Sequence, residues 1–103
     1  MTRLFNVTYE RITDASAEIG DAEERGFIAE DVSVREALSY ASQTVSAEVT
    51  AAEPDDSNVS AARWITFYGG RDMHSGDFVN ASIHFPEHIT GASRARLVRL
   101  LVK

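Results

Sequence analysis

The chain has 103 residues, a formal net charge of −6 at pH 7, 44% hydrophobic residues and no cysteine. This size fits a single domain (residues 1–103), and the hydrophobic content is that of a globular protein and not of a disordered tail. The absence of cysteine excludes disulfides and thiol chemistry, and the apolar runs are too short to span a bilayer. Because no signal-peptide pattern follows Met1, a cytoplasmic location is expected.

Charge is unevenly distributed along the chain. Residues 1–56 contain thirteen acidic and four basic residues, a net charge of −9, whereas residues 57–103 contain three acidic and six basic residues, a net charge of +3. A small acidic domain repels nucleic acid and attracts basic surfaces. Direct nucleic-acid binding and membrane association are therefore not expected, and the expected partner is a protein with a positive patch.

The first strand is expected over residues 4–12. Apolar and polar side chains alternate there, and the Val, Thr and Tyr residues favour a pleated surface. Residues 14–26 are acidic and contain two glycines, which predicts a loop with one helical turn. Residues 27–29 are expected to add a short extended piece.

An amphipathic helix is expected over residues 33–46. Ser33 and Glu36 have the spacing of a capping box, in which each side chain accepts a hydrogen bond from the backbone amide of the other residue. Apolar residues then recur at spacings of three and four, which places them on one face of a helix. These residues are Val34, Ala37, Leu38, Ala41 and Val45.

The second half of the chain predicts two strands and a helix. Residues 47–62 lose periodicity and include a Pro-Asp-Asp-Ser-Asn turn sequence, which predicts a long loop. Strands at 64–68 and 78–85, joined by a Gly-Gly pair and residues 71–76, predict a hairpin. Thr90 is expected to cap a last helix with a basic outer face.

Together these elements predict an α+β domain with the order β-α-β-β-α, in which two amphipathic helices pack on one face of a small antiparallel sheet. The sequence contains no internal repeat. An open sheet has exposed edge strands, and an exposed edge is a template for pairing between two copies. A homodimer is therefore consistent with the expected fold.

The histidines are the first candidates for chemistry. His84 and His88 are close in sequence, but Pro86 between them removes the helical spacing that a zinc site would use. His74 lies between Asp72 and Asp77, which could orient its imidazole as a base, although turn sequences produce the same cluster. Because the sequence contains no nucleophile elbow and no phosphate-binding loop, we expect a protein that is not an enzyme and needs no cofactor or metal.

The acidic segment between the first strand and the first helix is the expected partner-binding site. Six of its carboxylates are assigned to contact with a partner: Glu18, Asp21, Glu23, Glu24, Glu30 and Asp31. Charge complementarity with a basic surface would accelerate encounter and fix the register of binding. The same composition also suits an acidic loop that only keeps the protein soluble.

The alternative function uses the basic end of the chain. The last helix carries four cations, namely Arg94, Arg96, Arg99 and Lys103. Such a face could contact phosphates, as in a small DNA-associated accessory or regulatory protein. It could equally solubilise the helix and pair with the acidic half of the same chain.

Several short motifs, taken together, resemble a known group of proteins. They are YERIT (9–13), SAEIGD (16–21), GFIAE (26–30), VREAL (34–38), RWIT (63–66), SGD (75–77), SIHFP (82–86) and ITGASRARLVRL (89–100). In this order they resemble small uncharacterised proteins that bacterial phages and plasmids carry. The resemblance implies a mobile-element protein that blocks a host defence complex, of the anti-CRISPR type, with a CRISPR effector as the first target. It transfers no residue roles.

Overall fold

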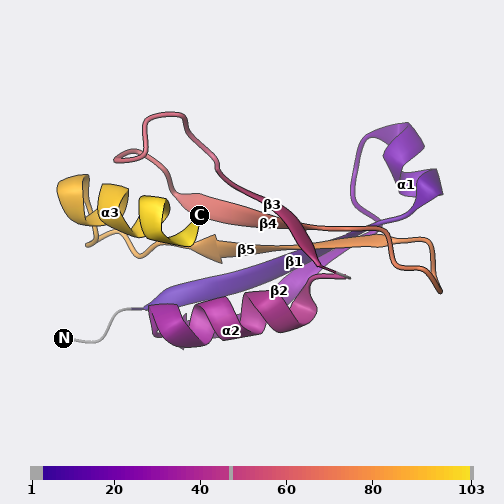
Figure 1. Cartoon of the computed structure of the whole chain (residues 1–103), viewed down its shortest axis with the longest axis horizontal. Helices are drawn as coiled ribbons and strands as arrows, with labels where there is room; N and C mark the ends of the chain where they lie inside the picture. The colour runs from indigo at the N-terminus through magenta and orange to yellow at the C-terminus, as the bar shows by residue number, and fades with distance from the viewer. Residues whose placement is uncertain (1–3, 47, 103) are drawn as a thin grey trace.

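Five antiparallel strands and three helices build the computed structural model, which describes residues 4–46 and 48–102 (Figure 1). The strands are β1 (Phe5–Ile12), β2 (Glu24–Val32), β3 (Val49–Pro54), β4 (Trp64–Gly69) and β5 (Phe78–His84), and the helices are α1 (Asp14–Ile19), α2 (Val34–Thr44) and α3 (Gly91–Leu101). The strands form one sheet in the order β2-β1-β5-β4-β3, so β2 and β3 are its edges. No described helix is long and apolar enough to cross a membrane.

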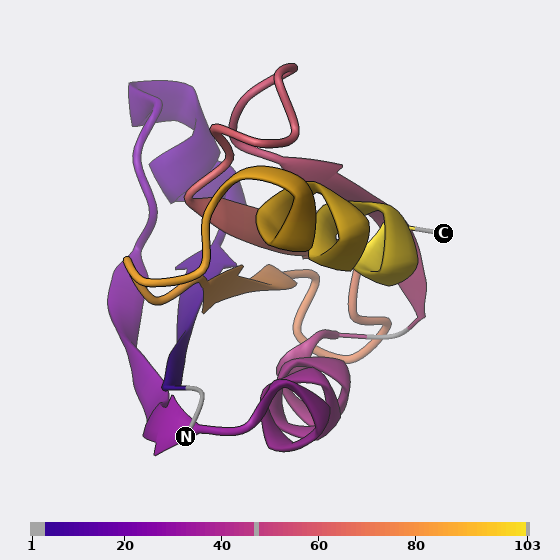
Figure 2. The ribbon, with the colours of Figure 1, turned by 90° about the vertical axis from the view of Figure 1, so that its left-hand side faces the viewer.

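The core forms on one face of the central strands. Val7 of β1 lies opposite Ile83 of β5, which in turn lies opposite Ile65 of β4, and all three side chains are fully buried. This arrangement follows from the alternation of apolar and polar residues in each strand. Helix α2 lies against β1, β5 and β2, below the curved sheet in Figure 2. The helices contribute Ala37, Ala41, Leu97, Val98 and Leu101 to the same core cluster.

The α+β class, the antiparallel sheet and the hairpin of β4 with β5 are confirmed. The expected order β-α-β-β-α, with two helices on one face, is not confirmed. Residues 14–26 were expected to form a loop with one helical turn, and α1 is the helix there; the short extended piece expected over 27–29 is part of the nine-residue strand β2, whose full length was not predicted. The described part of the expected loop 47–62 contains β3, which pairs with β4. Both missed strands are edges, where polar and small residues weaken the alternation that identifies a strand.

Helix α1 is held by a capping box that the sequence analysis missed. The Thr13 side chain accepts from the Ser16 amide and the Ser16 side chain accepts from the Thr13 amide, and Gly20 ends the helix with a φ of 75°. The last residue of a capping box, at helix position N3, is ordinarily Glu or Gln. Here this residue is Ser16, so the sequence does not match the usual motif. At α3, Thr90 occupies the N-cap position as expected, but its side chain makes no capping hydrogen bond.

The capping box predicted for α2 is present. Ser33 Oγ accepts from the Glu36 amide at 3.2 Å, and Glu36 Oε1 accepts from the Ser33 amide at 3.2 Å. The substitution Ser33→Ala is therefore expected to lower the free energy of unfolding by about 1 kcal/mol, measured by urea denaturation. The control Ser42→Ala changes an exposed serine inside the same helix and should leave stability equal or slightly higher. Equal stability of Ser33→Ala and the wild type would contradict a role for the cap.

Candidate functional site

Four of the six predicted partner-binding carboxylates lie together at one end of the sheet. Glu18 is on α1, Asp21 and Glu23 are in the turn that follows, and Glu24 begins β2. All four residues are exposed. We call these four residues the acidic corner.

Glu30 and Asp31 lie elsewhere. They are exposed and sit near the other end of β2, six and seven residues beyond Glu24, which is about 20 Å along an extended strand. Asp31 has a φ of 56°, and its amide donates to Asn6 Oδ1 at 3.0 Å where the pairing of β1 with β2 is irregular. The six residues therefore form one corner and one separate pair along the edge strand.

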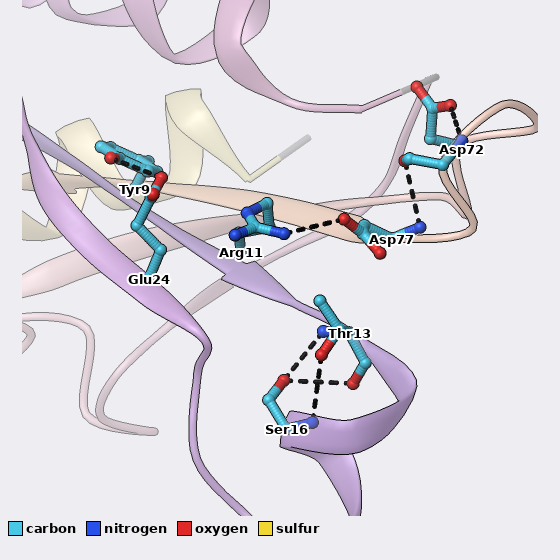
Figure 3. A network of polar contacts seen from close by, with 8 residues as sticks. Tyr9, Arg11, Thr13, Ser16, Glu24, Asp72 and Asp77 are labelled. Carbon is cyan, nitrogen blue, oxygen red and sulfur yellow. Dashed lines mark hydrogen bonds and ion pairs between the residues drawn. The ribbon is translucent and has the colours of Figure 1, made fainter.

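The acidic corner is fixed to the sheet by several polar contacts (Figure 3). The Tyr9 hydroxyl donates to Glu24 at 2.8 Å, and this hydrogen bond is the main reason that the pKa of Tyr9 is raised. The Arg25 guanidinium contacts Asp21 at 2.8 Å. Because these groups come from β1, β2 and the turn, the corner keeps a defined shape.

The hairpin loop between β4 and β5 lies at the same end of the molecule as α1 (Figure 1). Arg71 in this loop contacts Asp14 at the start of α1 at 3.2 Å, and Arg11 on β1 contacts Asp77 at 3.0 Å. Two segments that are far apart in sequence are therefore joined beside the acidic corner. Surface ion pairs of this kind stabilise weakly but help to orient the segments that they join.

Glu18 and Glu23 differ from their neighbours in the corner. Asp21 forms an ion pair with Arg25, and Glu24 accepts a hydrogen bond from Tyr9. Glu18 and Glu23 form no ion pair with any residue that the structure describes. Their carboxylates are exposed and unpaired among the described residues, although the Arg11 guanidinium, which is held by Asp77, also lies near enough to Glu23 to interact with its charge. These two groups are the ones that can form new charge pairs with a partner at the lowest desolvation cost.

Apolar side chains are also exposed at this end. Ile19, next to Glu18 in α1, is 79% exposed, and Met73 at the tip of the hairpin loop is 93% exposed. A single exposed apolar residue is ordinary on a protein surface. Beside charged residues, however, it provides the apolar contact around which a polar rim can form in an interface. The sequence analysis missed both residues because their positions depend on the fold of α1 and the loop.

The histidines that the sequence offered as candidates for chemistry lie in ordinary turn and strand contexts. The Asp72 carboxylate accepts hydrogen bonds from the backbone amides of His74 and Ser75, and these bonds lower its pKa. Asp77 pairs with Arg11. Within 4–46 and 48–102, no group of three or more His, Asp or Glu side chains could hold a metal ion.

His84 is the one histidine with a strongly structured environment in the described part of the chain. Its Nε2 lies 2.8 Å from Thr8 Oγ1, and its ring lies 5.7 Å from the Trp64 ring. Burial lowers the pKa of His84, and the nearby Asp55 carboxylate opposes this shift. His84 is therefore neutral in the native state at neutral pH.

The lowered pKa of His84 predicts a pH-dependent stability. The imidazole of His84 binds its proton at a higher pH in the unfolded chain than in the folded chain. The free energy of unfolding is therefore highest above about pH 6.5 and decreases as the pH falls toward the pKa of His84 in the folded state. Urea unfolding across this range should show a weaker pH dependence for His84→Gln than for the wild type. His88→Gln, at an exposed histidine, should keep the wild-type dependence. An unchanged pH dependence in His84→Gln would contradict this assignment.

Comparison of the chain with protein-family models, with curated proteins and with solved structures finds no match. The resemblance to phage and plasmid proteins therefore stays a prediction.

Proposed function

We propose that this chain is a non-enzymatic protein-binding module that uses the acidic corner to occupy a basic surface of a partner protein. The observation that carries the proposal is that Glu18 and Glu23 are exposed and form no ion pair among the described residues, on a corner held by α1, β1 and β2. Charge complementarity with such a surface accelerates association and fixes the orientation of the complex.

The biological form of the proposal is an inhibitor from a phage or other mobile element that blocks a host defence complex. This form is supported by the sequence resemblance and by the acidic charge, because defence complexes that act on nucleic acid carry basic grooves. A CRISPR effector complex is the first target to test. A cytoplasmic location in the host cell belongs to the same proposal.

The alternative is a DNA-associated protein that uses α3, and fewer cations of this helix are free to contact DNA than the sequence suggested. Arg94 is half-buried and donates from Nε to the carbonyl oxygen of Ile89 at 2.8 Å. Arg96 and Arg99 are exposed. Lys103, the fourth cation of this predicted face, lies outside the described residues. Among the described residues, two exposed arginines on α3 give little phosphate affinity to a chain of net charge −6.

The experiment that tests the proposal is affinity capture of the tagged protein from a lysate of bacteria with an active CRISPR system, with and without nuclease treatment. The proposal predicts a stoichiometric protein partner that is retained after nuclease treatment and released by high salt. Recovery only of nucleic acid, or of proteins that nuclease removes, would contradict it.

A further inference from the structure

The sheet face opposite the core carries a row of polar and aromatic side chains. Thr8 lies opposite Ser82, which lies opposite Thr66, and the hydroxyl oxygens of Ser82 and Thr66 are 2.9 Å apart. In the next row Trp64 lies opposite His84. These positions alternate with the buried core positions of the same strands, so they share the other face of the sheet.

Two hollows share His84 in their linings. One, of about 480 Å³, is lined by residues that include Arg63, Trp64, His84 and Arg94. The other, of about 470 Å³, extends the surface past Thr8 toward β2. It includes Phe27, an aromatic side chain that is 66% exposed on the edge strand. Aromatic rings from β2, β4 and β5 thus line one continuous surface.

The hollow around Trp64 also contains two guanidinium groups that lie close to aromatic rings. The Arg63 guanidinium lies 4.9 Å from the centre of the Trp64 ring, and Arg94 lies 6.0 Å from that of Phe85. Arg63 contacts Asp55 at 3.4 Å, whereas Arg94 pairs with no carboxylate among the residues described. Glu87 is the one carboxylate in the lining of this hollow.

The flat ring and the two guanidinium groups favour a ligand that is both aromatic and anionic. A nucleic-acid base can stack on a half-exposed indole, and this stacking tolerates any base because every base has a π-face. Guanidinium groups that are already stacked on rings can donate hydrogen bonds to phosphate oxygens in a fixed orientation. A duplex would not fit this chemistry because its base faces are already stacked.

We propose that the hollow formed by Arg63, Trp64, His84 and Arg94 binds a nucleotide unit of single-stranded nucleic acid, with a base on Trp64 and a phosphate between the two arginines. The site is independent of the acidic corner and lies toward the opposite end of the sheet. It departs from the expectation based on net charge, because Arg63 and Arg94 are brought together by the ends of β4 and α3. A free nucleotide presents the same chemistry.

Trp64 is the only tryptophan of the chain, so its fluorescence reports directly on this site. The purified protein would be titrated at low salt with a single-stranded oligothymidylate, with thymidine monophosphate and with a duplex. The proposal predicts saturable quenching by the single strand and none by the duplex. Equally tight saturation by the mononucleotide would support the site and identify a free nucleotide as its ligand. The absence of saturable quenching by both would overturn the proposal.

Matched variants separate this site from general charge attraction. Arg63→Gln removes an exposed guanidinium from the hollow, and Arg99→Gln makes the same charge change on α3 outside the lining. Arg63→Gln should weaken binding several-fold more than Arg99→Gln. Trp64→Leu, assayed by the anisotropy of a labelled oligonucleotide, should weaken it about ten-fold. Equal losses in the two arginine variants, or unchanged binding in Trp64→Leu with the fold retained by circular dichroism, would overturn the proposal.

Discussion

The substitution Gly69→Ala is expected to destabilise the domain by about 3 kcal/mol. A Cβ atom at Gly69 would lie 2.5 Å from the carbonyl oxygen of Val79, 2.7 Å from that of Ser46 and 2.7 Å from Val45 Cγ1. Two of these contacts are with backbone, which cannot move without disturbing the sheet. The Gly69 amide is further fixed by a 3.0 Å hydrogen bond to Asn80 Oδ1.

Urea denaturation of the variant measures this effect, and Gly91→Ala is its control. Gly91 has a positive φ of 56° but open space around the added Cβ, so its substitution costs only the left-handed conformation, about 1 kcal/mol. A loss at Gly69 no larger than that at Gly91 would show that the end of β4 can relax. The close packing of Gly69 against Val45 and Ser46 would then make little contribution to the free energy of unfolding.

The double substitution Glu18→Lys/Glu23→Lys is expected to weaken binding to a basic partner by ten-fold to one-hundred-fold. Both positions are exposed and make no described ion pair, so the fold should be retained while attraction becomes like-charge repulsion. Most of the effect should appear in the association rate and should shrink as salt rises. Surface plasmon resonance at two ionic strengths measures both quantities.

The control is Glu48→Lys/Glu53→Lys. Both residues are exposed, at and just before the opposite edge strand β3, and the change in net charge is the same. A localised acidic corner predicts a small effect for this control. If both double variants weaken binding equally, the attraction comes from net charge and not from the corner.

The sequence was most informative where one face of an element is buried. The strand at 4–12, the helix that begins after Ser33 and the hairpin of β4 with β5 each have apolar residues at a regular period, and each is present. The edge strands β2 and β3 could not be identified this way because neither strand contains a fully buried residue. Pairing with β1 and β4, and not local sequence, makes these segments strands.

The candidate sites show the same division. The composition predicted that the acidic residues would be exposed, and all six are. Their separation into a corner and a distant pair depends on the full length of β2, of which the sequence predicted only residues 27–29 as extended. The hollow around Trp64 depends on the strand register, which places Trp64 opposite His84 and brings Thr8 within hydrogen-bond distance of His84. The alternation of residues in 4–12 and in 64–68 identifies one outward-facing set of side chains in each strand. Only the sheet order, in which β5 lies between β1 and β4, brings the two sets onto one face.

The most direct test of the central claim is a parallel affinity capture with three forms of the protein as bait: the wild type, Glu18→Lys/Glu23→Lys and Glu48→Lys/Glu53→Lys. Nuclease-treated lysate would be used, and bound proteins would be quantified by mass spectrometry. The proposal predicts one protein partner that the wild type and the β3-edge variant recover equally and that the corner variant loses. Equal recovery of that partner by all three baits would contradict a binding role for the acidic corner.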